Sequence, residues 1–189
     1  MESFYDWGSI NLNNKEKLIQ DNYSKINQIS ARCMRVIVAI LALAFVYCYF
    51  GTDMDESVLI VFFASAIFIA LIPTLIINIL KFDHAPVTKH IVIICVCLIA
   101  TLMLTLLSTY AYPIMLFPIL LASLYYNQTL VLFASLLMSC GIVGSNYFAF
   151  RFSDVFIGFP CESFEEVMMS YVVPQIVVVF GLSVAAYFI

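Results

Sequence analysis

Apolar residues in this chain are grouped into six runs, and short polar stretches separate one run from the next. An apolar helix needs roughly 20 residues to cross the hydrocarbon core of a membrane, so runs of this kind predict transmembrane helices. We expect six spans, at residues 36–50, 58–80, 91–108, 113–126, 129–150 and 167–189. The pattern therefore predicts an all-α fold, an integral membrane bundle of six transmembrane helices. The fourth span is short and follows the third closely, which predicts a tight helical hairpin.

Residues 1–35 precede the first span and have a more polar sequence. Asn13 and Glu16 have the spacing of a capping box, which predicts that a helix begins near Asn13. The apolar positions that recur every seven residues from next to that start are Leu12, Ile19, Ile26 and Cys33. We therefore expect a cytoplasmic N-terminal amphipathic helix. It either lies at the membrane interface, with its cations near anionic lipid, or acts as a dimerisation or docking helix.

Composition supports the assignment to a membrane. Hydrophobic residues make up 64% of the chain and charged residues 11%, which leaves too little polar surface to cover a soluble globule. Membrane lipid is therefore an expected partner. The formal net charge is −4, and nucleic acid is excluded as a partner because no basic patch is present to bind it.

The eight Lys and Arg residues are distributed unevenly over the predicted layout. Seven of them precede the first span or lie between the second and third: Lys15, Lys17, Lys25, Arg32, Arg35, Lys81 and Lys89. Only Arg151 falls on the opposite side. Because Lys and Arg in short loops are retained in the cytoplasm, we expect a multi-pass protein of the cell membrane with both termini cytoplasmic.

The six cysteines do not form a metal-binding pattern. Cys95 and Cys97 are two residues apart on a helix, so their side chains point to nearly opposite faces. We expect the thiols within the spans to pack as small apolar groups. Cys161 is the exception, because it is predicted to lie outside the cell, where it could pair between subunits.

Residues with catalytic potential are sparse. His84 and His90 lie beside Asp83 in or next to a loop, but no nucleophile with a matching base is nearby. Glycine-rich phosphate loops, paired histidines on a helix and nucleophile elbows are all missing from the sequence. We therefore expect no catalytic residues, no metal ligands and no cofactor. The spans also contain no charged residue away from their ends, which counts against an ion-coupled transporter or proton pump.

Prolines inside or at the edge of predicted spans mark the best candidates for a cavity. Each removes a backbone donor and tends to kink its helix, and the freed carbonyl needs another partner. Such prolines are Pro73, Pro118 and Pro174. The candidate residues for binding an unknown small ligand are Pro118, Ser123, Tyr125, Tyr126 and Asn127. The alternative is that the tyrosines belong to the aromatic belt of the membrane interface.

Three stretches resemble the N-terminal multi-span modules of bacterial diguanylate cyclases, especially clostridial ones. They are KLIQDNYSKINQISARCMRVIVAILAL around the first span, PILLASLYYNQTLVLFASLLMS around the fourth and fifth, and SYVVPQIVVVF in the sixth. In that family the module precedes a cytoplasmic GGDEF domain that makes cyclic di-GMP, and similar modules precede histidine kinase or chemoreceptor domains. The resemblance implies a sensory input domain and a homodimer that forms through the output domain.

The end of the chain fits this expectation, because the last span is still apolar at Ile189. A complete six-span protein would normally have a polar or basic residue after its last helix, so we expect a membrane domain cut from a longer protein. Nothing in the sequence matches a GGDEF motif. A second hypothesis is a six-span small-molecule-binding subunit of a transporter, similar to those of energy-coupling-factor systems. In that case Ala66 and Ala70 would offer a small face for a partner helix.

Overall fold

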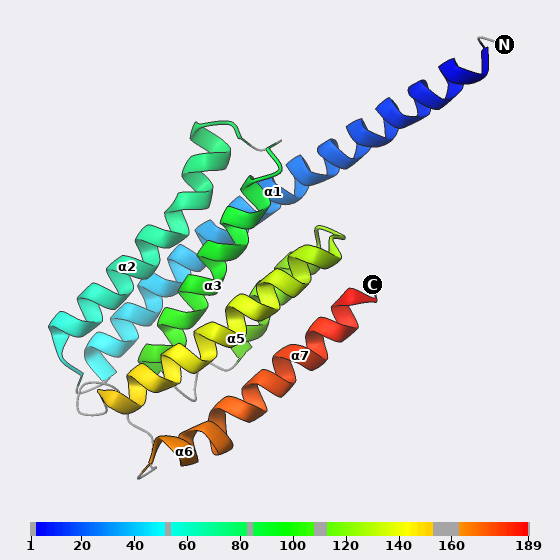
Figure 1. Cartoon of the computed structure of the whole chain (residues 1–189). Helices are drawn as coiled ribbons and strands as arrows, with labels where there is room; N and C mark the ends of the chain where they lie inside the picture. The colour runs from blue at the N-terminus through cyan, green and yellow to red at the C-terminus, as the bar shows by residue number, and fades with distance from the viewer. Residues whose placement is uncertain (1–2, 52–53, 83–84, 108–112, 153–162, 189) are drawn as a thin grey trace.

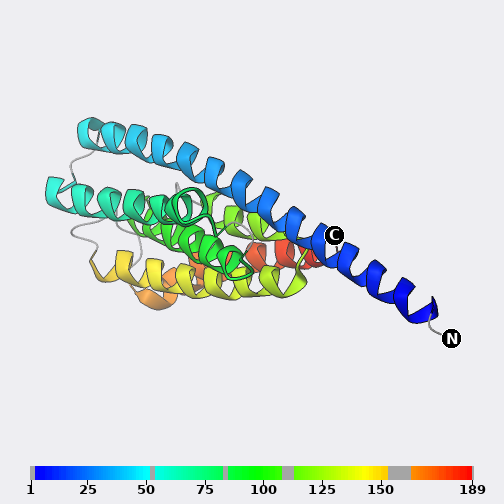
Figure 2. The ribbon, with the colours of Figure 1, turned by 90° about the horizontal axis from the view of Figure 1, so that it is seen from above.

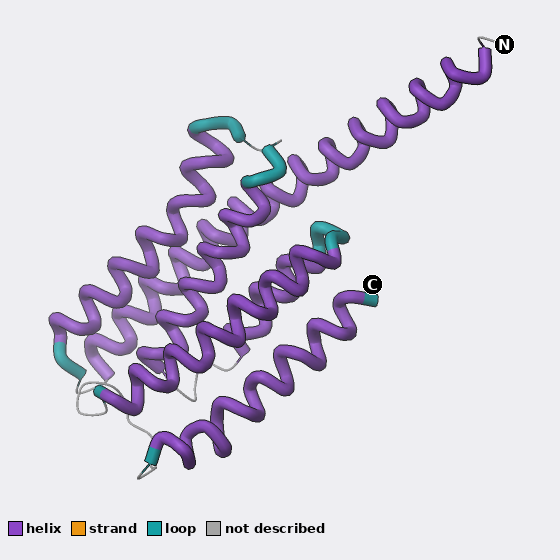
Figure 3. Tube along the Cα trace, viewed as in Figure 1, coloured by secondary structure: helices purple, strands orange, loops and turns teal. Residues whose placement is uncertain are grey.

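A computed structural model describes residues 3–51, 54–82, 85–107, 113–152 and 163–188, and within these the side chains of residues 3–17 and 19 are not described. The described residues are almost entirely helical (Figures 1 and 3). Five of the helical segments are long and apolar enough to cross a membrane: Gln20–Gly51, Glu56–Ile79, Thr88–Leu107, Gln128–Arg151 and Phe164–Tyr187. They match five of the six predicted spans, so the described residues form a helical architecture that is compatible with a membrane bundle.

The helices follow one another with short connections. Their bounds are α1 Ser3–Gly51, α2 Glu56–Thr74, η1 Leu75–Ile79, α3 Thr88–Leu107, α4 Phe117–Ser123, α5 Gln128–Arg151, α6 Phe164–Val167, η3 Met168–Val172 and α7 Val173–Tyr187. Here η1 and η3 are π-helical turns that continue α2 and join α6 to α7. Pro174 follows η3, and its missing N–H frees a carbonyl in the preceding turn, where a local π adjustment is a known response.

The N-terminal helix and the first span are one uninterrupted helix. α1 has 49 residues, which gives a length of about 74 Å, more than twice the roughly 30 Å hydrocarbon core. It begins at Ser3 rather than near the predicted start at Asn13. Its N-terminal part projects beyond the other helices without a sharp bend (Figures 1 and 2). This direction differs from that of a helix lying in the membrane interface, which would have to turn before the span.

The fourth predicted span is shorter than expected. The apolar helix there covers Pro113–Ser123 instead of residues 113–126, a length of about 16 Å, or half of the hydrocarbon core. It ends early because Tyr126 has a left-handed backbone (φ 49°) and Asn127 already caps the next helix. α4 packs against α3, α5 and α7.

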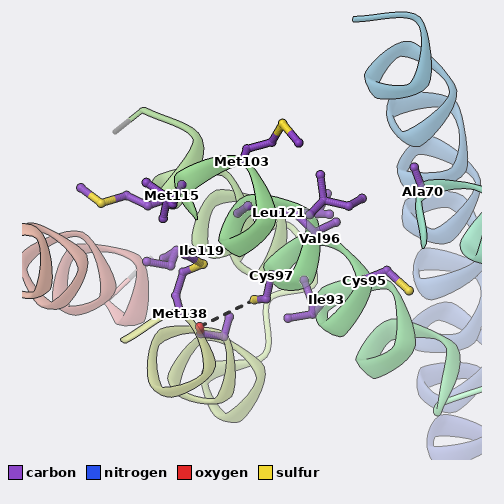
Figure 4. Packing of buried hydrophobic residues seen from close by; sticks show 14 of the residues in the cluster. Ala70, Ile93, Cys95, Val96, Cys97, Met103, Met115, Ile119, Leu121 and Met138 are labelled. Atoms are coloured by element: carbon purple, nitrogen blue, oxygen red, sulfur yellow. Dashed lines mark hydrogen bonds between the residues drawn. The ribbon is translucent and has the colours of Figure 1, made fainter. Parts of the chain in front are cut away.

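The core surrounds α3, which contacts α1, α2, α4 and α5. Within its most apolar stretch 61% of residues are buried, against 17% to 39% in the other four long segments. Figure 4 shows Ile93, Val96 and Cys97 of α3 packed near Leu121 of α4 and Met138 of α5. Cys95 and Cys97 are free and buried in this apolar packing, as predicted. Cys161 lies outside the described residues.

Basic residues gather at one end of the bundle, which we call the basic end. The N-terminal part of α1, the α2–α3 connection, the α4–α5 turn and the last turn of α7 all lie there (Figures 1 and 2). Lys81 and Lys89 flank the α2–α3 connection, and Arg151 ends α5 at the opposite end. The fold therefore keeps the sorting of positive charge that the sequence shows.

Candidate functional site

The turn between α4 and α5 reverses the chain within a few residues. The amide of Tyr126 donates to Ser123 O at 3.0 Å, and Asn127 Oδ1 accepts from the Leu130 amide at 3.1 Å to cap α5. Tyr126 adopts the left-handed conformation that closes the turn, which costs a residue with a side chain roughly 1–2 kcal/mol. Glycine would adopt this conformation more easily than tyrosine. Backbone strain of this kind is often found at functional sites, so the turn is a candidate site.

A cavity of about 330 Å³, which we call the turn pocket, opens beside this turn. Its walls are Ser123, Tyr126, Asn127, Gln128, Thr129 and Val131 on one side and Ala186 and Tyr187 on the other. Gln128 Nε2 donates to Tyr187 O at 3.2 Å, so α5 and the last turn of α7 are linked at its edge. The volume is at the lower end of the range for small-molecule sites. The turn pocket thus lies where α7 reaches the basic end.

Three of the five predicted ligand-binding residues line the turn pocket: Ser123, Tyr126 and Asn127. Tyr125 is buried on the other side of the turn, and Pro118 is buried in the first turn of α4 and does not line the cavity. Of the polar lining residues, Gln128, Thr129 and Tyr187 are not among the predicted ones. Gln128 and Thr129 directly follow the predicted residues, whereas the contribution of Tyr187 depends on how α7 packs.

Tyr125 joins the turn to α1. Its hydroxyl donates to Asn27 Oδ1 at 2.7 Å and lies 3.4 Å from Ser30 Oγ. Its ring centroid is 6.3 Å from that of Tyr23. Asn27 and Ser30 have no exposed surface, so these hydrogen bonds satisfy polar groups that would otherwise be costly to bury.

A lysine completes this contact between helices. Lys89, in the first turn of α3, is only 8% exposed, and its Nζ lies 4.4 Å from the centroid of the Tyr23 ring. An ammonium group over an aromatic face is attracted by the ring quadrupole, most strongly where water is excluded. Tyr23 therefore contacts both Lys89 and Tyr125. This cluster could not be predicted from local sequence patterns, because its members are far apart along the chain.

Polar side chains also connect α5 and α7 along their length. The contacts are Gln128 with Tyr187, Ser135 with Ser183, and Asn146 with Gln175. Asn146 Nδ2 donates to Gln175 Oε1 at 3.3 Å, but the buried Nε2 of Gln175 has no partner among the described residues. An unpaired buried donor costs roughly 1–3 kcal/mol. α7 is thus held partly by polar contacts, one of which is incompletely satisfied.

The small residues of α2 do not form a docking face. Ala66 and Ala70 are fully buried within the bundle, where α2 packs against α1 and α3. The predicted surface for a partner helix is therefore wrong for these two residues. Small residues let neighbouring backbones approach closely, and here they serve the packing of the chain itself.

The turn pocket is suited to hydrogen bonding rather than to chemistry. Its polar lining consists of hydroxyl and amide groups from Ser123, Tyr126, Asn127, Gln128, Thr129 and Tyr187. Such groups donate and accept hydrogen bonds without a carboxylate, ammonium or imidazole, so they fit a small neutral polar molecule. Comparison of the chain with protein-family models, with curated proteins and with solved structures gave no match.

Proposed function

We propose that this chain is the membrane-embedded input domain of a bacterial signalling protein and that α7 passes its signal to a cytoplasmic output domain. The observation that supports this most is the position of the α4–α5 turn. Tyr125 contacts α1 through Asn27, and the next residue, Tyr126, lines the pocket that the last turn of α7 closes. The α4–α5 turn therefore contacts both α1, whose N-terminus lies at the basic end, and α7, whose C-terminus lies there.

The signal would act through this turn. A ligand can shift an equilibrium between two arrangements only by binding one of them more tightly. A small polar molecule in the turn pocket would contact Tyr126 and Tyr187 together, so it would favour one position of α7 relative to the turn. Because Tyr125 holds the same turn against α1, a shift of the turn would also change the packing of α1. Small displacements of packed helices are a common form of signalling transition.

The positive-charge sorting and the family resemblance support the remainder of the proposal. The basic end would face the cytoplasm, so α1 and α7 would both point toward an output domain there. The resemblance to input modules of diguanylate cyclases implies a GGDEF domain as that output. Its activity would be cyclic di-GMP synthesis in a homodimer, and the membrane domain would control it without a catalytic group of its own.

The relay through the turn can be tested by hydrogen exchange on the whole chain in detergent. Replacing Tyr125 with Phe removes the donor to Asn27 Oδ1 and weakens the packing of the turn by about 1–2 kcal/mol. Local opening should become easier in two places, in α1 near Asn27 and in the last turn of α7. The amide exchange rate at both places should therefore rise roughly 5- to 30-fold.

The matched control is Tyr126→Phe, since the Tyr126 side chain is 76% exposed. It should leave the exchange of α1 unchanged. A Tyr125→Phe effect that is confined to α1 would show that the turn does not couple the two helices.

The identity of the output has a separate test. The gene should continue in frame past the codon for Ile189 into a signalling domain, with a GGDEF motif if the resemblance holds. A stop codon directly after Ile189 would refute the input-domain proposal, whatever the hydrogen exchange shows.

A further inference from the structure

A second cavity at the basic end has a different chemistry from the turn pocket. It has a volume of about 320 Å³ and lies between α1 and the end of η1. We call it the basic cavity, and its lining residues are Gln28, Arg32, Arg35, Ile77, Asn78 and Lys81. Three of these six carry a positive charge and none is acidic. Like charges gathered in one concave site repel one another and favour an anion between them.

The backbone that carries Lys81 is unusual in two ways. The segment before it is a π-helical turn, Leu75–Ile79, and such turns occur often at functional sites. Lys81 itself is left-handed (φ 56°) at the end of that helix, where glycine is the residue that adopts this conformation at lowest cost. A lysine here places a cation at the rim of the cavity despite the strain. Strain of this kind is often found where the side chain has a function.

The position of the basic cavity along α1 indicates which anion is near it. Arg32 lies 19 positions before Gly51, the last residue of α1, which corresponds to about 28 Å along the helix axis. If Gly51 marks one membrane surface, Arg32 is close to the other, because the hydrocarbon core is roughly 30 Å thick. Arg35 lies one turn deeper, about 24 Å from Gly51, but long cationic side chains extend toward the membrane surface. With that placement, the guanidinium groups of Arg32 and Arg35 would both reach the level of the lipid phosphates.

An apolar stripe continues from Arg32 toward the opposite end of α1. Its members lie 4, 8, 11 and 15 positions after Arg32, which places them on one helical face: Val36, Ile40, Leu43 and Tyr47. All four are between 57% and 76% exposed in the bundle. An anionic head group in the basic cavity would thus have an apolar surface next to it for its acyl chain.

We propose that the basic cavity binds the phosphate of an anionic phospholipid, whose acyl chain lies along this stripe of α1. Arg32 and Arg35 present planar donor pairs that match phosphate oxygens, and Lys81 adds a point charge. Gln28 and Asn78 offer uncharged donors and acceptors for head-group hydroxyls. A zwitterionic lipid fits less well, since its ammonium group would lie near the same three cations. This site is independent of the turn pocket and of the signalling proposal.

The test is thermal unfolding of the whole chain in nonionic detergent as phosphatidylglycerol is added. A ligand that binds only the folded protein raises the melting temperature with concentration. Phosphatidylglycerol should do so, and phosphatidylcholine with the same acyl chains should have a much smaller effect. Inorganic phosphate and glycerol phosphate distinguish a free phosphate from a lipid. Equal protection by either soluble compound would overturn the assignment to lipid.

Variants locate the site. A cation near the membrane surface contributes about five-fold to the affinity for anionic lipid. Arg35→Gln should therefore need about five-fold more phosphatidylglycerol to reach the same rise in melting temperature. Lys25→Gln is the matched control, because Lys25 lies on the same helix outside the basic cavity. An equal loss in Lys25→Gln and Arg35→Gln would show diffuse attraction to the bundle rather than a site and would overturn the proposal.

A further variant separates binding from folding. Lys81→Gly removes the cation and relieves the backbone strain, because glycine adopts the left-handed conformation of this position at low cost. It should therefore raise the melting temperature without lipid and reduce the shift that phosphatidylglycerol causes. These two changes have opposite signs, and a general loss of folding cannot produce them. A full phosphatidylglycerol shift in Lys81→Gly would contradict the role of Lys81.

Discussion

Gly141 and Gly144 lie three positions apart on α5, at neighbouring positions of the helix, but their surroundings differ. A Cβ atom added at Gly141 would overlap with Thr101 Oγ1 of α3, whereas a Cβ atom at Gly144 would have no neighbour within 4 Å. Thr101 cannot turn away without cost, since its hydroxyl donates to Cys97 O at 2.9 Å. Gly141 is therefore a position of close approach between α3 and α5.

This difference predicts opposite effects for the same substitution. Gly141→Ala should lower the free energy of unfolding by about 1–3 kcal/mol, because it overpacks the α3–α5 contact. Gly144→Ala should raise it by up to about 1 kcal/mol, because alanine favours a helix more than glycine does. Denaturant titration in detergent measures both, each against the unchanged chain. Equal destabilisation by the two variants would contradict the packing described for α5.

Single residues also show where prediction from the sequence reaches its limit. The sequence predicts one candidate site that contains both Tyr125 and Tyr126, but the left-handed backbone of Tyr126 turns the two side chains toward different helices. Two successive tyrosines do not predict a left-handed backbone at the second one. The partners of Tyr125 are 95 and 98 positions away, so local pattern could not identify them.

At the scale of elements, α7 is held against α5 by a buried polar contact that is incompletely satisfied. Asn146 Nδ2 donates both to Ile142 O at 2.7 Å and to Gln175 Oε1 at 3.3 Å. Gln175 has only this one hydrogen bond for its buried side chain among the described residues. The side chains of Asn146 and Gln175 therefore contribute unequally to the free energy of unfolding. Removing Gln175 removes an unpaired donor, whereas removing Asn146 leaves the whole Gln175 amide buried without a partner.

We expect this inequality to appear in the stability of variants. Asn146→Leu should lower the free energy of unfolding by about 1–3 kcal/mol, the cost of an unsatisfied buried amide, whereas Gln175→Leu should not lower it. The double variant should recover most of the loss, so a double-mutant cycle would give a large coupling energy. If Gln175→Leu proves as destabilising as Asn146→Leu, the unpaired donor is not a source of instability in α7.

Elements were predictable to the extent that hydrophobicity and length determine them. Five spans have the expected positions because a long apolar run in lipid must form a helix to satisfy its backbone. The short α4 was missed, since residues 113–126 remain apolar through a turn that ends the helix. The two π-helical turns were missed as well, because they depend on packing as much as on the nearby prolines.

The whole molecule combines a projecting helix, a bundle and two cavities at its basic end. The turn pocket is uncharged and lies between α5 and α7, while the basic cavity lies between α1 and η1. Both are at the end where, in the proposed function, α7 would lead into an output domain. Membrane composition and a small polar ligand could therefore act on the same end of the bundle through different helices.

This arrangement requires that the basic end faces the cytoplasm, which fusions to reporter proteins can test. Fluorescent protein should fold when fused after Pro86 or Phe188, and alkaline phosphatase should be active when fused after Phe152. The reasons are that Lys81 and Lys89, on either side of Pro86, favour retention inside, and that the phosphatase needs disulfides that form outside. In this layout the chain passes between the two ends of the bundle an even number of times, although α4 by itself is too short to cross a membrane. Phosphatase activity after Phe188 would show an odd number instead, and α7 could then not carry a signal into the cytoplasm.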